Sequence, residues 1–194
     1  SRGVIELLSK LMEPSYLASD FSSLAQLQTI LVMASNPCPC GQGLSERGCR
    51  CSPSRKNSYL SKFSGAFLDR VDLFCEVDES VVCQTKDNLS SENIRHKIIS
   101  ARNHLHSVLC RSGTDKQESE FAQYQFLTSH LTSDAKNALH KAHLNLALSN
   151  RGLFKTLKIA RTIASIEQAT AISKDHIVEA IGYRRCGWIQ SQIK

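Results

Sequence analysis

The stretch Asn36–Val77 reads NPCPCGQGLSERGCRCSPSRKNSYLSKFSGAFLDRVDLFCEV, and it decides the expected fold. An apolar run, Leu27–Ala34 (LQTILVMA), leads into Asn36, and a strand-like run with two acidic residues, Val71–Val77, begins directly after Arg70. A buried strand that ends in a polar residue is how α/β nucleotide enzymes place a side chain at a phosphate. The stretch therefore predicts two strands, with Asn36 after the first. Arg70 stands before the second, held stiffly enough to be offered to a neighbouring subunit.

The same stretch contains four of the eight cysteines in the spacing C-x-C-x8-C-x-C, at Cys38, Cys40, Cys49 and Cys51. Four thiolates this close in sequence can make a tetrahedral zinc site that pins the loop. The C-x-C spacing is tighter than the usual C-x₂₋₄-C pattern, so a reduced loop without metal and a disulfide remain alternatives. A four-cysteine site leaves no open coordination position, so zinc here would be structural.

Helical periodicity dominates the rest of the chain. Apolar residues recur at helical spacing in Gly3–Met12, and Ser54–Phe63 is a short polar helix candidate. Beyond Asp78 the pattern predicts helices only, with a polar loop at Arg111–Glu120. The four helices expected there are Ser91–Cys110, Ser133–Leu148, Arg151–Glu167 and Lys174–Arg184, the last with Ser173 as its N-cap. The expected class is α/β plus α, with an α/β segment followed by a four-helix domain.

Composition and charge narrow the classes of partner. The apolar runs fall far short of the roughly 18 residues that a membrane span requires, and no secretion signal opens the chain. We therefore expect a cytoplasmic protein with no membrane partner. Residues 1–85 contain 8 Lys/Arg against 9 Asp/Glu, whereas residues 86–194 contain 16 against 9. This asymmetry suits a partner with phosphates, and a solvated helical surface explains it equally well.

Two blocks of sequence resemble the magnesium-chelatase-like AAA+ ATPases, specifically their competence-associated branch. The first is the stretch quoted above, whose NPCPCG, C-x-C, Tyr59, Ser64-Gly65 and LDR-x-D elements match the family pattern. The second comprises LSNRGLFKTLKIARTIA and HIVEAIGYRR near the end of the chain. The resemblance implies that residues 1–85 form the C-terminal part of an AAA+ αβα core with a Cys-rich insert, and that residues 86–194 form a helical lid.

The resemblance also implies ATP and Mg²⁺ as cofactors, assembly into a homo-oligomeric ring, and ATP-driven processing of DNA during transformation or recombination. The phosphate-binding loop and the acidic Walker B strand would lie upstream, since these residues contain no G-x-x-x-x-G-K-[ST] motif and no apolar run ending in Asp-Glu. The chain then resembles a C-terminal portion, or a split or decayed gene product. We expect no ATP hydrolysis by the chain alone.

Family motifs assign roles to four residues. Asn36 matches sensor 1, which contacts the γ-phosphate or orients the attacking water, and its alternative is a turn before Pro37. Arg70 matches the arginine finger, and its alternative is a surface ion pair with Asp69 or Asp72. Arg151 matches sensor 2, with Lys155 on the same helix face, and the alternative for both is a solvated face. Arg161 lies about 80° around that helix and is expected to be structural or inter-subunit.

Two other functions remain open. A magnesium-chelatase motor subunit would drive metal insertion into a porphyrin, although the Cys-rich insert belongs to the competence-associated branch. A non-hydrolysing, zinc-stabilised basic module would bind nucleic acid or cap a ring.

Overall fold

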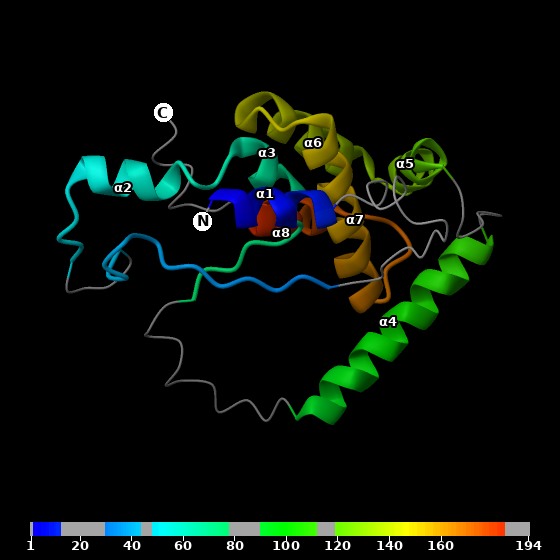
Figure 1. Ribbon diagram of the computed structural model, residues 1–194. Coiled ribbons are helices and arrows are strands. Elements are labelled where there is room, and N and C mark those ends of the chain that lie inside the picture. The colour runs from blue at the N-terminus through cyan, green and yellow to red at the C-terminus, as the bar shows by residue number, and fades with distance from the viewer. Residues whose placement is uncertain (1, 13–29, 44–47, 78–89, 112–118, 185–194) are drawn as a thin grey trace, which may run out of the picture. The chain divides into compact units, whose positions relative to one another are not determined.

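The computed structural model describes residues 2–12, 30–43, 48–77, 90–111 and 119–184 (Figure 1). These residues divide into two compact units, one within Ser1–Gln84 and the other within Thr85–Arg185. Within the described ranges the regular elements are helices, and Leu131 and Ile172 form an isolated parallel β-bridge.

The first unit contains α1 (Arg2–Leu11), α2 (Pro53–Leu60) and α3 (Gly65–Arg70). Helix α1 packs against α3. The expected helices near residues 3–12 and 54–63 are confirmed, whereas the short α3 was not expected. Its sequence, GAFLDR, opens with glycine and is too short for a periodic pattern, and its start is set by the Ser64 hydroxyl, which accepts the Phe67 N–H at 3.2 Å.

The two strands expected at residues 27–34 and 71–77 are not found among the described residues. Residues 30–34 and 71–77 belong to neither helix nor strand, while residues 27–29 lie outside the described ranges. A strand requires a neighbour that accepts and donates its backbone hydrogen bonds, and no described segment supplies that partner. The apolar side chains of the first run are accordingly exposed, Ile30 at 90% and Val32 at 87%. The αβα core expected for residues 1–85 is therefore not observed in the part of the chain that the structure describes.

The described residues of the second unit form five helices where four were expected. They are α4 (Ser91–Arg111), α5 (Glu120–Ser129), α6 (Ser133–Leu146), α7 (Asn150–Ile166) and α8 (Lys174–Arg184). The additional helix is α5, in which the neighbours Phe126 and Leu127 are buried while Phe121 is exposed. This arrangement produces no stripe at helical spacing. Within the loop expected at residues 111–120, residues 112–118 lie outside the described ranges.

Helix starts in this unit are set locally by hydroxyl side chains. Each of five helices is preceded by a Ser or Thr whose oxygen accepts an N–H from the first turn, and such caps typically contribute about 1 kcal/mol. These residues are Ser90, Ser119, Thr132, Ser149 and Ser173. The expected cap at Ser173 is thereby confirmed.

Helix α7 is the centre of the second unit and packs against α4, α5 and α8, while α6 packs against α8. Leu157, Ala160 and Ala164 on α7 have no exposed surface. Around them lies one aliphatic core with Val108, Phe126, Leu127, Leu131, Ala135, Leu139, Ile163, Ile172, Ile177 and Ala180. The Leu131–Ile172 bridge joins the α5–α6 and α7–α8 connections, with Ile172 N–H donating to the His130 carbonyl at 2.7 Å.

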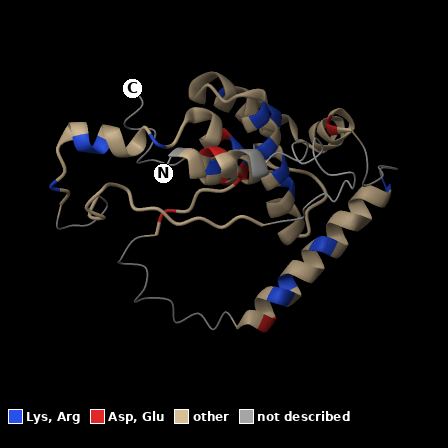
Figure 2. Ribbon diagram, viewed as in Figure 1, with Lys and Arg blue, Asp and Glu red and all other residues tan. Residues whose placement is uncertain are grey.

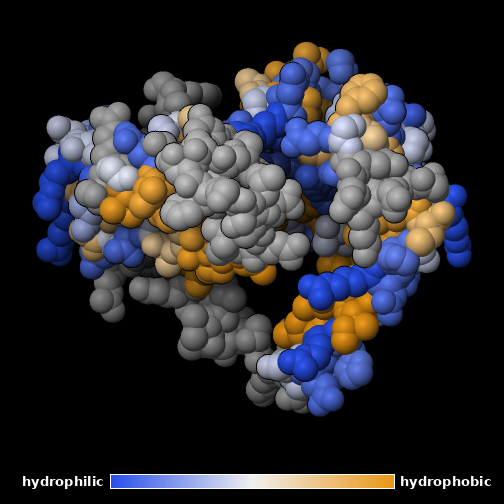
Figure 3. Space-filling model, turned by 45° about the vertical axis from the view of Figure 1, so that its right-hand side comes forward, coloured by the Kyte–Doolittle hydropathy of each residue, from blue (hydrophilic) through white to orange (hydrophobic). Residues whose placement is uncertain are grey.

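Only the C-terminal half of α4 contributes to this core. Every residue of Ser91–Ser100 is exposed, whereas Ala101 and Val108 are buried. Lys and Arg recur along α4 (Figure 2), and the space-filling view shows apolar patches among hydrophilic surface (Figure 3). Ile94 and Ile98 of α4 are exposed. None of the described helices has the length and apolar character needed to cross a membrane.

Candidate functional site

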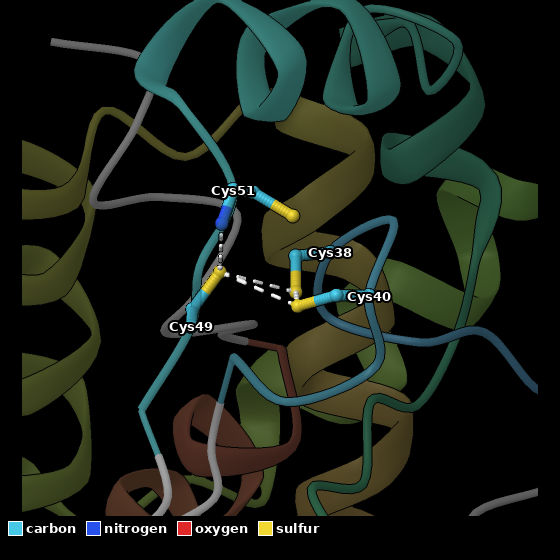
Figure 4. A group of neighbouring side chains, drawn as sticks. All are labelled: Cys38, Cys40, Cys49 and Cys51. Carbon is cyan, nitrogen blue, oxygen red and sulfur yellow. Dashed lines mark hydrogen bonds between the residues drawn. The ribbon is translucent and has the colours of Figure 1, made fainter.

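The structure brings the four predicted cysteines together at one point. The Sγ atoms of Cys38, Cys40, Cys49 and Cys51 all lie within 4.8 Å of one another. Figure 4 shows the side chains of the two C-x-C pairs pointing toward a common centre. Cys38 is buried at 2% exposure, Cys49 and Cys51 are half-buried, and Cys40 is exposed. The quartet is thus a cluster in space as well as in sequence.

The sulfur spacing matches a metal site better than a disulfide. The Sγ–Sγ distances are 3.3 Å for Cys38–Cys40, 3.7 Å for Cys40–Cys49 and 3.4 Å for Cys49–Cys38. Zinc–sulfur bonds of about 2.3 Å in a tetrahedron place the sulfurs about 3.8 Å apart, whereas a disulfide requires about 2.05 Å. All four are free thiols. Four close cysteines of this geometry can hold a metal ion.

Backbone hydrogen bonds lower the pKa of two thiols of the quartet, and burial raises the pKa of the other two. The Gln42 backbone lowers the pKa of the Cys40 thiol to about 6, and the Cys51 backbone N–H, 3.4 Å from the Cys49 sulfur, lowers the pKa of Cys49. Burial raises the pKa of Cys38 and raises that of Cys51 to about 11. Thiolate is the form that binds a metal, so two sulfurs are already inclined to ionise, and a divalent cation would displace the protons of the other two.

Two glycines give the first C-x-C pair its conformation. The Gly41 N–H donates to the Cys38 carbonyl at 3.0 Å, and Gly41 has φ +78°, a value that side chains disfavour. A Cβ on Gly43 would lie 3.1 Å from Pro37 Cβ and 3.4 Å from Cys38 Sγ. The turn therefore needs a residue without a side chain at both positions to bring Cys38 and Cys40 to the same centre.

Asn36 lies immediately before this turn with its side chain exposed. Its backbone carbonyl accepts the Tyr59 hydroxyl at 3.0 Å, and the same hydroxyl lies 3.0 Å from Ser35 Oγ. Gly41 lies near the Asn36 side chain, since a Cβ at Gly41 would be 3.7 Å from Asn36 Nδ2. The sequence offered Tyr59 only as a matching motif position, because a contact across 23 residues leaves no periodic signal.

Arg70 is the last residue of α3 and is half-buried. Its Nη1 donates to the Ala66 carbonyl one turn earlier at 2.7 Å. Val71 ends the helix in an extended conformation, and its N–H donates to the Leu68 carbonyl at 3.2 Å. Arg70 therefore projects from the C-terminal end of a short helix, whereas the sequence predicted that it stands directly before a strand.

Arg151 and Lys155 lie one turn apart at the start of α7. Arg151 is exposed and Lys155 is half-buried, while Leu157 and Ala160 on the other side of the helix are fully buried. The Lys158 ammonium, farther along the same face, lies 4.2 Å from the centre of the Phe154 ring. The helix thus presents a basic face away from the core, as its periodicity predicted.

Arg161, on the same helix, has a structural position. It is 2% exposed, and its guanidinium donates to Ser165 Oγ at 3.3 Å, to the Thr170 carbonyl at 2.6 Å and to the Ala169 carbonyl. It thereby closes the connection from α7 to α8. Of the two roles considered for Arg161, the structural one is confirmed by these contacts.

His176 at the start of α8 is a buried residue that the sequence did not single out. Its Nδ1 accepts the Ser173 N–H at 3.0 Å, so its Nε2 carries the proton and donates to Glu167 at 2.8 Å. These bonds hold the same α7–α8 connection as Arg161. Within the described residues, the first unit therefore contains the cysteine cluster, Asn36 and Arg70 as candidate functional residues. The second unit contains Arg151 and Lys155.

Comparison with known proteins finds matches along both halves of the chain. The family described as "Magnesium chelatase, subunit ChlI C-terminal" matches residues 88–184, and the family described as "Magnesium chelatase, subunit ChlI" matches residues 18–85. No solved structure matches the chain significantly.

Curated relatives are bacterial. The chain is 32% identical to the uncharacterized protein YifB of Escherichia coli (strain K12) over 158 residues, which are 79% of this chain and 30% of YifB. It is also 32% identical to competence protein ComM of Haemophilus influenzae over 160 residues, 79% of this chain and 30% of ComM. The chain thus spans about 30% of the length of the curated relatives it matches.

Proposed function

Because the chain belongs to the magnesium-chelatase family, we propose that it is the C-terminal part of an AAA+ ATPase. In this proposal residues 1–85 complete the nucleotide-binding core and residues 86–194 form its lid. The observation that carries the proposal is the pair of family matches, to residues 18–85 and 88–184, which together include Asn36, Arg70 and Arg151. The ATPase works in the cytoplasm with ATP and Mg²⁺, both bound chiefly by Walker motifs that these 194 residues do not contain.

Asn36 acts as the sensor in this mechanism. Its exposed carboxamide donates to the γ-phosphate or accepts from the attacking water, while the Tyr59 hydroxyl restrains its backbone by donating to its carbonyl. Phosphoryl transfer depends mainly on such positioned polar groups and on charge stabilisation.

Arg70 acts as an arginine finger in trans. A delocalised guanidinium close to the transferred phosphoryl stabilises charge that develops in the transition state, and such residues are worth roughly 10³–10⁵ in rate. In the structure Arg70 Nη1 donates to the Ala66 carbonyl at the end of α3. In a ring, the side chain leaves this position and extends toward nucleotide on the next subunit of a homo-oligomeric assembly.

Arg151 and Lys155 close the lid on nucleotide. Both project from the first two turns of α7, a helix whose opposite side is fixed in the aliphatic core. A rigid helix lets the lid approach the phosphates as one body. Since these groups contact nucleotide before the reaction as well as during it, they contribute to ATP binding and to turnover.

The cysteine cluster holds one structural Zn²⁺, with Cys38, Cys40, Cys49 and Cys51 as ligands. A zinc ion of this type supplies folding energy and no chemistry on substrate, because four protein ligands fill its coordination sphere. The centre joins the turn after Asn36 to the residues that precede α2, since Cys51 is followed by the N-cap residue Ser52.

DNA is the partner we propose for the assembled ATPase. The excess of seven positive charges in residues 86–194 and the exposed basic face of α4 favour a phosphate-rich partner. The same observations favour a second candidate function, in which the chain is a basic module that binds nucleic acid or caps a ring without hydrolysis.

An ATPase complementation assay tests the first proposal. The chain is mixed with a polypeptide that carries the Walker motifs of the same ATPase, and turnover and ATP affinity are measured. We expect Arg70→Ala to cut turnover roughly 10³-fold or more with ATP affinity retained, and Arg151→Ala to weaken both. Arg55→Ala, an exposed arginine on α2, is the matched control. Turnover within a few-fold of wild type in Arg70→Ala would refute the finger.

Metal analysis tests the zinc centre independently of ATPase activity. Protein purified without added zinc should contain about one equivalent, as expected of a four-thiolate site. The Cys49→Ser/Cys51→Ser variant should lose the metal, and Cys110→Ser, outside the cluster, should keep it. Metal content near zero in the wild-type chain would favour a reduced loop instead.

A further inference from the structure

We propose that Tyr59 is a positioning residue that couples Asn36 to the helix carrying Arg70, through an aromatic ladder formed by Tyr59, Phe63 and Phe67. The inference rests on the proposed function, because it gives the sensor and the finger a physical connection inside one subunit. It assigns no new contact with nucleotide. Tyr59 acts through the backbone of Asn36 at one end, and Phe67 acts through α3 at the other.

The hydroxyl of Tyr59 controls the backbone on which the Asn36 side chain stands. It donates to the Asn36 carbonyl at 3.0 Å and lies 3.0 Å from Ser35 Oγ. The next residue, Pro37, offers no N–H and has a restricted φ, so the Asn36 carbonyl is the hydrogen-bonding group of this peptide unit. A bond to that carbonyl sets the orientation of the unit, and hence the direction in which the carboxamide points.

The ring of Tyr59 starts a continuous aromatic contact toward α3. Tyr59 and Phe63 meet edge to face with their centroids 6.1 Å apart, and Phe63 and Phe67 follow at 6.2 Å. These separations fall within the range in which aromatic pairs attract each other. The Lys62 ammonium lies 5.3 Å from the centre of the Tyr59 ring, which further restrains it.

The ladder ends on the element that carries the finger. Phe67 is 4% exposed, and its N–H is held by the Ser64 hydroxyl that caps α3. Arg70 lies three residues later on this six-residue helix and donates to the Ala66 carbonyl. Since α3 is less than two turns long, a shift of Phe67 moves Arg70 with it. A change at Asn36 is thereby transmitted to the residue that acts on the neighbouring subunit.

Hydrogen exchange on the 194-residue chain tests the physical link without ATPase activity. Tyr59→Phe removes one hydroxyl and keeps the ring, and Tyr183→Phe removes a hydroxyl that donates to Glu179 on the exposed side of α8. We expect Tyr59→Phe to speed amide exchange across Gly65–Arg70 about two- to tenfold, as loss of one neutral hydrogen bond implies. Tyr183→Phe should leave that segment unchanged. Phe63→Leu, which interrupts the ladder and keeps the hydroxyl, should also speed exchange in α3.

Turnover in the complemented ATPase tests whether the link serves catalysis. Tyr59→Phe should lower kcat with ATP affinity unchanged, and it should have no further effect in an Arg70→Ala background. If Asn36→Ala and Arg70→Ala leave turnover unchanged, the proposed function itself fails. If those two variants lower kcat while Tyr59→Phe resembles Tyr183→Phe in kcat and exchange, the positioning role is overturned. A change in exchange without a change in kcat also overturns it, since Tyr59 would then be structural only.

Discussion

Replacing Arg161 by methionine should destabilise the second unit, whereas the same replacement at Arg151 should not. Both arginines belong to α7, ten residues apart, and they differ in environment. Arg161 is 2% exposed and donates to Ser165 Oγ and to the carbonyls of Ala169 and Thr170. Burial lowers the pKa of Arg161 below its usual value, yet the guanidinium remains the donor that these acceptors need at neutral pH.

The size of the effect follows from the acceptors left behind. Methionine fills much of the volume of the arginine stem and donates no hydrogen bond. A hydrogen bond from a charged donor contributes about 1.5–3 kcal/mol, so loss of the two bonds to the Ala169 and Thr170 carbonyls should cost about 3–6 kcal/mol in unfolding free energy. For a domain of about 100 residues, 1 kcal/mol corresponds to roughly 4 °C, so the melting temperature should fall by about 12–24 °C. Arg151→Met should cost at most about 1 kcal/mol, the usual limit for an exposed charge.

Chemical denaturation and thermal melting of the two variants measure this difference. The complemented ATPase should show the reverse order at a temperature where both variants are folded, with ATP affinity lost in Arg151→Met and retained in Arg161→Met. Equal stability of the two variants would refute the structural assignment of Arg161. Unchanged ATP affinity in Arg151→Met would refute the sensor assignment.

Three other predictions concern the metal centre and the isolated chain. Gly43→Ala places a Cβ 3.1 Å from Pro37 Cβ. Zinc affinity measured against a chelator should therefore fall about 10–100-fold, a typical effect of disturbing the residues that support a metal ligand. Equal affinity would contradict a role of Gly43 in positioning Cys38. The amount of zinc retained in dialysis should fall with decreasing pH, because protons compete with the metal for the sulfurs. The fall should be steeper below about pH 6, where Cys40 also binds a proton in the metal-free chain. A zinc content that does not depend on pH would exclude thiolate ligands. The 194-residue chain alone should release no phosphate from ATP, since it contains no phosphate-binding loop; hydrolysis that disappears in Arg151→Ala would contradict this.

Helices were the most predictable part of the fold, because their signals are local. Periodicity located α4, α6, α7 and α8 to within a few residues, and Ser173 was recognised as a cap from its position alone. Helix α5 was missed because its buried residues, Phe126 and Leu127, are neighbours and form no stripe. The two expected strands are not found among the described residues, because strand pairing depends on a neighbouring strand that no described segment supplies.

The candidate functional residues were predictable where their spacing in the sequence indicates a chemical role. The C-x-C-x8-C-x-C pattern identified the four sulfurs, and motif matches identified Asn36, Arg70, Arg151 and Lys155. The roles of the last four stay predictions. Tyr59 could be noticed only as a motif position, since its bond to the Asn36 carbonyl joins residues 23 apart.

Sequence alone determined which residues are able to ligate a metal, cap a helix or carry charge, because those properties belong to the side chain and its near neighbours. Helix geometry separated Arg161 from Arg151, and tertiary structure decided between a structural and an inter-subunit role for Arg161, since its burial depends on the carbonyls of Ala169 and Thr170 accepting its hydrogen bonds. Tertiary structure also decided that the sulfurs of two separate C-x-C pairs meet within 4.8 Å. Hydrogen bonds and packing between distant residues arise only when the chain closes on itself, and no local pattern encodes them.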